Sequence, residues 1–179
     1  VLCLPVFFGA LVVLFRRKGG PGVDVDVGYY GKRVAWVTNK GTKSQNEDSA
    51  WVDDRVLQDG VRAVVACVAD GVSGGRNGSQ VSAMAVQAVK EAFGSATSDV
   101  LSNAETLGEW TASWVEPLQA KILAQYPRGY STLCVFAALE NVWAILNVGD
   151  SVVFWIPDDG SGIRRLSTSQ PPPAAKPRL

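Results

Sequence analysis

The stretch from Ala63 to Asp70 constrains the fold of this chain more than any other stretch. It is an unbroken apolar run rich in valine, which is typical of a strand buried on both faces. The run ends on Asp70, and Gly71 follows at once. A carboxylate at the end of a buried strand is unfavourable without a positive partner, and Arg76 is the nearest basic residue after it. We therefore expect Asp70 to bind a metal ion; the alternative is an aspartate that closes the strand through a turn or a helix cap.

The chain contains no histidine, which excludes Ser-His-Asp and Cys-His catalysis and imidazole metal ligands. Its three cysteines form no CxxC pair, and Cys67 and Cys134 lie in apolar strand patterns typical of buried, reduced thiols. Any bound metal must therefore be held by carboxylates, backbone carbonyls and water, which are the ligands of Mg²⁺, Mn²⁺ and Ca²⁺. The formal charge is zero, which argues against nucleic acid as the main partner.

Apolar periodicity predicts strands, then two helical regions, then strands again. Residues from Val81 to Phe93 recur at i, i+3 and i+4, which predicts an amphipathic helix that follows Gly78 and ends at Gly94. A second helical region is expected over 103–125, divided or kinked at Pro117. Hydrophobic residues make up 47% of the chain, so we expect a globular domain. The order of strands, helices and strands predicts an α+β fold with helices packed on a largely antiparallel sheet. The strands are predicted over 33–38, 49–53, 63–70, 131–139, 142–148, 152–156 and 163–166.

Both ends of the chain differ in composition from the domain itself, which is assigned to residues 32–169. Residues 1–18 form an apolar run that ends in three basic residues, so they are either the remnant of a membrane anchor or a strand or helix docked on the domain. The protein is accordingly expected in the cytoplasm, with a tether to the inner face of the membrane if the anchor exists. Residues 19–31 are expected to be a linker, although their Val-Asp alternation also fits a short edge strand. The proline-rich tail, 170–179, is expected to be extended or disordered.

Three acidic clusters lie at the ends of predicted strands: Glu47-Asp48, Asp70-Gly71 and Gly149-Asp150-Ser151. In a chain without histidine, three such clusters indicate one carboxylate site for hard divalent metal ions. Two metal ions bridged by a carboxylate lower the pKa of a bound water and clamp a phosphoryl group.

Four segments carry a resemblance to a known family. They are GTKSQNED (41–48), VADGVSGG (68–75), GYSTL (129–133) and NVGDS (147–151). In their order and spacing they resemble the successive motifs of metal-dependent type 2C protein phosphatases of the bacterial kind, over about residues 33–169. The resemblance implies a four-layer α-β-β-α sandwich with metal ions in a cleft at one end of the two sheets. It also implies hydrolysis of phosphoserine and phosphothreonine in proteins by a hydroxide that bridges the metal ions, without a phosphoenzyme.

The resemblance also assigns ligands for two or three Mg²⁺ or Mn²⁺ ions. By this match, Asp70 bridges two ions and Gly71 offers its backbone carbonyl. Glu47 and Asp48 bind through metal-bound waters, and Asp150 is tied to a third, weaker ion. Asp70, Asp48 and Glu47 are therefore the expected catalytic residues.

Two departures from the family pattern concern the substrate and the general acid. Lys43 stands where the family usually has arginine, so it is expected to contact the substrate phosphate as a point charge without a bidentate fork. Val72 stands where some members have histidine, which excludes a histidine acid. Asn46 and Ser151 also match motif positions, with turn and cap roles as the alternative.

The family domain is longer than this chain and has two more metal-binding aspartates on later strands. The sequence therefore predicts an incomplete metal site, because Asp158 and Asp159 fall in a predicted hairpin turn and do not replace that pair. Two hypotheses follow: a serine/threonine phosphatase domain acting on phosphoproteins, or a catalytically impaired module that binds a phosphoprotein or a regulatory partner. Nucleotide binding is a weaker third, because the glycines at 71, 74, 75 and 78 match no phosphate-binding loop pattern.

Overall fold

The computed structural model describes residues 9–13, 25–30, 34–39, 44–57, 60–72, 77–100, 104–139, 142–157 and 162–167. Its first five strands are β1 (Gly9–Val13), β2 (Val25–Tyr30), β3 (Val34–Asn39), β4 (Asp48–Val56) and β5 (Arg62–Asp70). The helices follow as α1 (Gly78–Ser95), α2 (Ala104–Ser113) and α3 (Val115–Gln125). The remaining strands are β6 (Leu133–Leu139), β7 (Val142–Val148), β8 (Val153–Pro157) and β9 (Arg164–Arg165). This order of strands, helices and strands is the one that the apolar pattern predicts.

The central sheet is antiparallel and has the strand order β4-β5-β6-β7. β5, the valine-rich run, pairs with β4 on one side and with β6 on the other. Buried and half-buried positions alternate along β5, so one of its faces is covered more completely than the other. The run is therefore a central strand as predicted, but its second face is less fully buried than an all-apolar pattern suggests.

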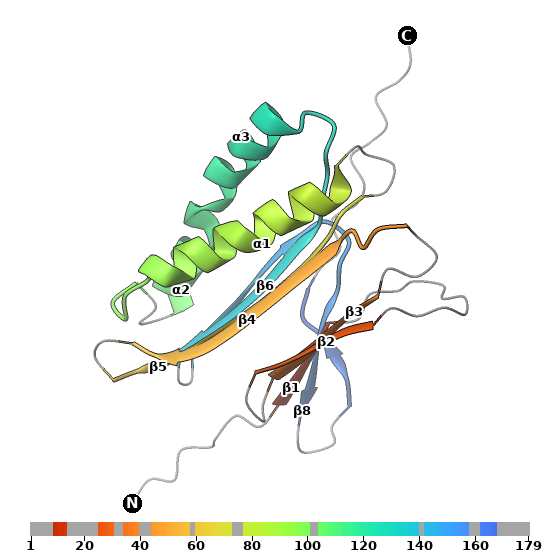
Figure 1. Cartoon of the computed structure of the whole chain (residues 1–179). Coiled ribbons are helices and arrows are strands. Elements are labelled where there is room, and N and C mark those ends of the chain that lie inside the picture. Colours follow the sequence, from red (N-terminus) through yellow and green to blue (C-terminus); the bar gives the residue numbers. More distant parts are fainter. Residues whose placement is uncertain are drawn as a thin grey trace, which may run out of the picture.

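The described helices lie on one side of the central sheet, where α1 and α2 contact its strands and α3 packs against α1 and α2 (Figure 1). α1 turns Val81, Ala85, Val89 and Phe93 into the core, where each is almost completely buried. The ring of Phe93 meets two tryptophans edge to face, one on β4 and one on α2, at centroid distances of 6.0 and 6.4 Å. Burying one such side chain stabilises a domain by about 1.5–3 kcal/mol, so this predicted apolar stripe is what holds α1 on the sheet.

Two helix boundaries differ from those predicted. α1 continues through Gly94 to Ser95 and is capped by the N–H of Ala96, which donates to the carbonyl of Phe93. The second helical region is divided at Trp114 and not at Pro117. Proline is tolerated in the first turn of a helix because the N–H groups there have no partner within the helix.

The other face of the central sheet is covered by a second layer of strands, drawn opposite the helices in Figure 1. This layer contains the hairpin β2-β3, which contacts β4, and a sheet with the order β1-β8-β9. The fold is thus α+β, and the described residues form one helical layer and two β layers of the expected four-layer sandwich. A second helical layer is not among the residues that the structure describes.

The N-terminal region contains more regular structure than a linker would. Residues 25–30 form β2, which corresponds to the strand alternative and not to the linker expected over 19–31, because alternating valines followed by two tyrosines favour a strand. Residues 9–13 pair with β8 as β1, which corresponds to the docked alternative for that segment. In the described ranges no helix is long and apolar enough to cross a membrane. The membrane anchor over 1–18 remains a prediction.

Several predictions fall on residues outside the described ranges. They concern the phosphate-binding residue Lys43, the turn residues Asp158 and Asp159, and the proline-rich tail over 170–179.

Cys67 on β5 and Cys134 on β6 are buried free thiols, as the sequence predicts. Burial disfavours the charged thiolate and raises the pKa of both groups from 9.0 to about 12. At pH 8 we therefore expect both to react with iodoacetamide about 1,000-fold more slowly in the folded chain than in denaturant. Peptide-resolved mass spectrometry measures the rates of labelling, and equal rates in the folded chain and in denaturant would contradict the burial of these thiols.

The raised pKa of these thiols also makes the stability depend on pH. The free energy of unfolding should be insensitive to the two thiols below pH 9 and should fall as the pH rises from about 9 towards 12.

Candidate functional site

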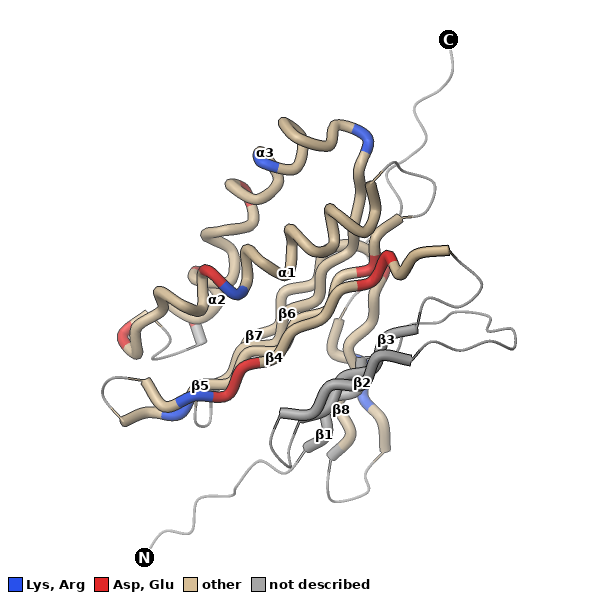
Figure 2. The backbone as a smooth tube through the Cα atoms, in the orientation of Figure 1, with Lys and Arg blue, Asp and Glu red and all other residues tan. Residues whose placement is uncertain are grey.

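Two carboxylates face each other where β4 begins and β5 ends. Asp48 and Asp70 are direct register partners, so their side chains project from the same face of the sheet. This is the face away from the helices, because their neighbours Ser49 and Ala69 face α1 and the helical core. Figure 2 shows these acidic residues gathered at the strand ends, beside the start of α1. Like charges directly opposite each other destabilise a sheet by several tenths of a kcal/mol, so a cation at this position would stabilise the pair.

The start of α1 is packed directly against the end of β5. The N–H of Gly71 donates to the carbonyl of Glu47 at 3.0 Å, which ties the two strand ends together. A Cβ on Gly71 would lie 2.3 Å from the carbonyl oxygen of Gly78, so only glycine permits this approach. The Glu47 Oε1 lies 3.2 Å from where a Cβ of Gly78 would be, next to the helix N-terminus, which favours a negative charge. The carboxylate of Glu47 is therefore on the helix side of the strand ends, whereas those of Asp48 and Asp70 are on the other.

The backbone of Asp70 is hydrogen-bonded to both backbone and hydroxyl groups of the two residues before β6. The N–H of Thr132 donates to the carbonyl of Asp70 at 2.9 Å, and Ser131 Oγ donates to the same carbonyl at 3.1 Å. In return, the N–H of Asp70 donates to Thr132 Oγ1 at 3.1 Å. Ser151 Oγ also donates to Thr132 Oγ1, at 2.8 Å. The end of β5 is thus fixed from the β6 side by side chains as well as by backbone.

The third predicted cluster reaches the same edge of the sheet. Asp150 lies two residues after the end of β7 and is exposed, and the last residue of β7, Val148, pairs with Leu133. Asn46 makes a turn, because its Oδ1 accepts the N–H of Asp48 at 3.1 Å, which is the local role considered as the alternative. Among the residues that the structure describes, no three acidic or cysteine side chains converge closely enough to hold a metal ion.

The donors at this edge fit a hard divalent cation in kind but not in number. The structure pairs Asp48 with Asp70, and carboxylates and backbone carbonyls are the donors that Mg²⁺ and Mn²⁺ prefer. The close packing of Gly71 on Gly78 fixes the backbone at the point where a carbonyl ligand is expected. Six oxygens are the usual requirement, so these residues supply part of a coordination shell.

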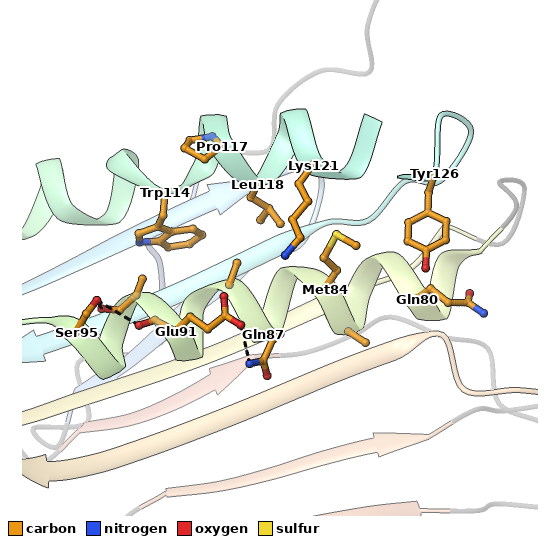
Figure 3. A pocket seen from close by; sticks show the side chains of 13 residues that line it. Gln80, Met84, Gln87, Glu91, Ser95, Trp114, Pro117, Leu118, Lys121 and Tyr126 are labelled. Carbon is orange, nitrogen blue, oxygen red and sulfur yellow. Dashed lines mark hydrogen bonds between the residues drawn. The ribbon is translucent and has the colours of Figure 1, made fainter. Parts of the chain in front are cut away.

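A separate groove of about 700 Å³ lies between α1 and α3 (Figure 3). Met84 on α1, Leu118 on α3 and Trp114, which immediately precedes α3, form its apolar walls, and Glu91 and Lys121 also line it. All three apolar residues also belong to the core or pack against it. None of the predicted site residues lines this groove.

Sequence reasoning missed the roles of Thr132, Ser131 and Gly78. Thr132 and Ser131 belong to the third motif, GYSTL, which indicates the family but predicts no contact for either residue. Two hydroxyl residues immediately before an apolar strand were the available signal. For Gly78, the sequence indicates only that a helix begins close to it. Its contact with Gly71 depends on how α1 packs, which no local pattern specifies.

Solved bacterial phosphatases share this fold. The chain resembles the serine/threonine phosphatase Stp1 from Staphylococcus aureus with a TM-score of 0.55 and 18% identity, covering 88% of this chain and 58% of that one. For the S. agalactiae serine/threonine phosphatase the TM-score is 0.57 at 19% identity, with 90% and 56% covered. For the Mycobacterium tuberculosis phosphatase PstP/Ppp it is 0.51 at 16% identity, with 83% and 53% covered. The chain therefore spans little more than half the length of these structures.

The sequence comparisons give one further match. No curated protein matches the chain in sequence. The family model described as protein phosphatase 2C matches residues 41–175, which include all four motif segments and most of the chain. The fold and the family match agree with the resemblance drawn from the motifs. The chain belongs to the protein phosphatase 2C family.

Proposed function

We propose that this chain carries part of the active site of a metal-dependent phosphatase that hydrolyses phosphoserine and phosphothreonine in proteins. The observation that carries the proposal is the direct pairing of Asp48 with Asp70 at one edge of the sheet, inside the segment that matches the family. Two carboxylates directly opposite each other repel, whereas a divalent cation bound between them would be attracted to both. The partner that follows from this activity is a phosphoprotein substrate.

The proposed roles follow the family match residue by residue. Asp70 and the carbonyl of Gly71 would hold Mg²⁺ or Mn²⁺ directly, and Glu47 and Asp48 through water. When bound, such ions supply Lewis acidity that polarises a phosphoryl group and activates water for attack. The chain itself keeps Asp70 in place through the backbone clamp and brings the start of α1 close to Glu47. Asp150 would serve a further ion.

Lys43 would orient the phosphate of the substrate. In the sequence, Lys43 lies only a few residues before Glu47 and Asp48, and this proximity along the chain supports the proposal. A lysine offers a single flexible charge, so we expect weaker orientation of the phosphate than an arginine would give.

The second candidate function is a module that binds a phosphoprotein or a regulatory partner without turnover. It is favoured by the absence, within the described ranges, of three convergent acidic side chains. A site with two paired carboxylates would hold a cation weakly, and a weakly held cation binds phosphate better than it catalyses its transfer.

Comparing two lengths of the protein distinguishes the two candidates. We expect the 179-residue chain to hydrolyse a phosphothreonine peptide, with Mn²⁺ present, at least ~100-fold more slowly than a chain extended with the rest of the domain from a related phosphatase. This ratio corresponds to about 2.7 kcal/mol in the activation barrier, attributed to the missing metal ligands. Equal rates in the same buffer would contradict the incompleteness of the site. Phosphopeptide binding by both lengths without turnover by either would favour the binding module.

A further inference from the structure

Both the hydroxyl oxygen and the methyl group of Thr132 contact neighbouring residues. Its Oγ1 accepts the N–H of Asp70 at 3.1 Å and the hydroxyl of Ser151 at 2.8 Å. Its methyl group lies against Gly149, where a Cβ would come within 2.9 Å of Thr132 Cγ2. Gly149 has a φ of +97°, a conformation that glycine adopts without strain. The rotamer of Thr132 is therefore set from both sides, and only 8% of the residue is exposed.

The groups that Thr132 fixes are those that set the direction of the Asp70 side chain. Thr132 binds both backbone groups of Asp70, on the two sides of its Cα: Thr132 Oγ1 accepts the N–H of Asp70, and the backbone N–H of Thr132 donates to the carbonyl of Asp70. β5 ends at this point: Gly71 forms an isolated bridge with Ser131 and donates its N–H to the carbonyl of Glu47, and the N–H of Val72 donates to the carbonyl of Tyr130. Asp70 is thus the last residue of β5 that the sheet can orient, and a side chain performs part of that task.

We propose that Thr132 is a positioning residue for Asp70, locked by Ser151 and given room by Gly149. Metal-binding carboxylates must be held within about 0.5 Å of their productive geometry, and outer hydrogen bonds to such ligands are commonly worth 10–100-fold in metal affinity. The hydroxyl of Thr132 acts one step further out, because it accepts the backbone N–H of Asp70 and so orients the carboxylate through the backbone. The proposal rests on the proposed metal site in so far as it concerns affinity, but its structural part, the orientation of Asp70, is independent of metal.

The test compares Thr132→Val, which keeps the shape and loses Oγ1, with Thr132→Ser, which keeps the hydroxyl and loses the methyl group. Thr111→Val is the matched control, because Thr111 is equally buried and its hydroxyl donates to the carbonyl of Gly108 on α2, away from the site. Isothermal titration calorimetry with Mn²⁺ on the 179-residue chain should show a 10–100-fold loss of affinity for Thr132→Val. Thr132→Ser and Thr111→Val should stay within about 3-fold of the parent, and Ser151→Ala should fall between these results.

A second measurement on the metal-free chain separates this proposal from the proposed function. Amide hydrogen exchange followed by NMR should be at least about 10-fold faster at Asp70 in Thr132→Val than in Thr111→Val, after correction for the global stability of each variant. If the parent chain binds no Mn²⁺ but this difference is found, the metal site fails and the positioning role stands. Unchanged exchange at Asp70 would overturn the proposal, and so would equal Mn²⁺ affinities of Thr132→Val and Thr111→Val if the parent chain binds Mn²⁺.

Discussion

Replacing Asp70 with asparagine is expected to lower the affinity of the 179-residue chain for Mn²⁺ by more than ~100-fold. The substitution keeps the shape of the side chain and removes its charge. In the metal-free chain, the same change removes the repulsion between Asp70 and Asp48, its register partner across β4 and β5. We therefore expect the metal-free variant to be as stable as the parent or more stable by about 0.2–1 kcal/mol. Calorimetry gives the affinity, and urea unfolding in EDTA gives the stability.

The matched control for this variant is Asp53→Asn. Asp53 lies on β4, the strand that pairs with β5, and its register partner is Val65 instead of an acidic residue. We expect neither the Mn²⁺ affinity nor the metal-free stability to change appreciably in this control. An unchanged Mn²⁺ affinity in Asp70→Asn would show that Asp70 is not a ligand. A loss of affinity in both variants would instead indicate a general effect of negative charge.

Even the smallest side chain at Gly71 is expected to disrupt the site. A Cβ there would lie 2.3, 2.4 and 2.7 Å from backbone atoms of Gly78 and Glu47, and these atoms can move only if α1 or the start of β4 moves. Overpacking of a core commonly costs 1–3 kcal/mol, and we expect Gly71→Ala to reach about 3 kcal/mol because backbone and not side-chain atoms obstruct it. Gly71→Val should cost more. Both variants should also lose Mn²⁺ affinity, because α1 and Glu47 would be displaced from the strand ends.

Gly94→Ala controls for the loss of a glycine. Gly94 lies inside α1, and a Cβ there would meet nothing within 4 Å. Alanine is the better helix former, so this variant should be stabilised by up to about 1 kcal/mol. Thermal unfolding and calorimetry compare the variants. If Gly71→Ala is as stable as Gly94→Ala and binds Mn²⁺ as the parent does, the close contact between β5 and α1 has no role in the site.

The local elements of this fold could be predicted from the sequence because each has its own periodicity. The 3.6-residue repeat from Val81 to Phe93 appears as the buried face of α1, and the valine-rich run appears as the central strand β5. Boundaries were less well predicted where two signals compete. Pro117 is a signal for a kink or a division in a helix, but it is accommodated in the first turn of α3, where its missing N–H is not needed.

The motifs identified the family correctly because they are short and contiguous, and Asp70-Gly71 stood out because an acid at the end of an apolar run is unusual. Their arrangement in space is a different matter. Asp48 and Asp70 meet because β4 and β5 pair in one register, and a shift of one residue would place the two carboxylates on opposite faces. Nothing within either segment specifies that register, which is set by the whole sheet and the layers that cover it.

The sequence by itself therefore determined which residues form strands and helices, which family the chain belongs to and which acids are candidates. Only the tertiary structure decided that Thr132, 62 residues along the chain from Asp70, supports its backbone, and that Gly71 must accept the start of α1 at contact distance. The physical reason is the range of the interactions. Periodicity and turn chemistry act over a few neighbouring residues, whereas hydrogen bonds across a sheet and close backbone packing join segments that only the complete fold brings together.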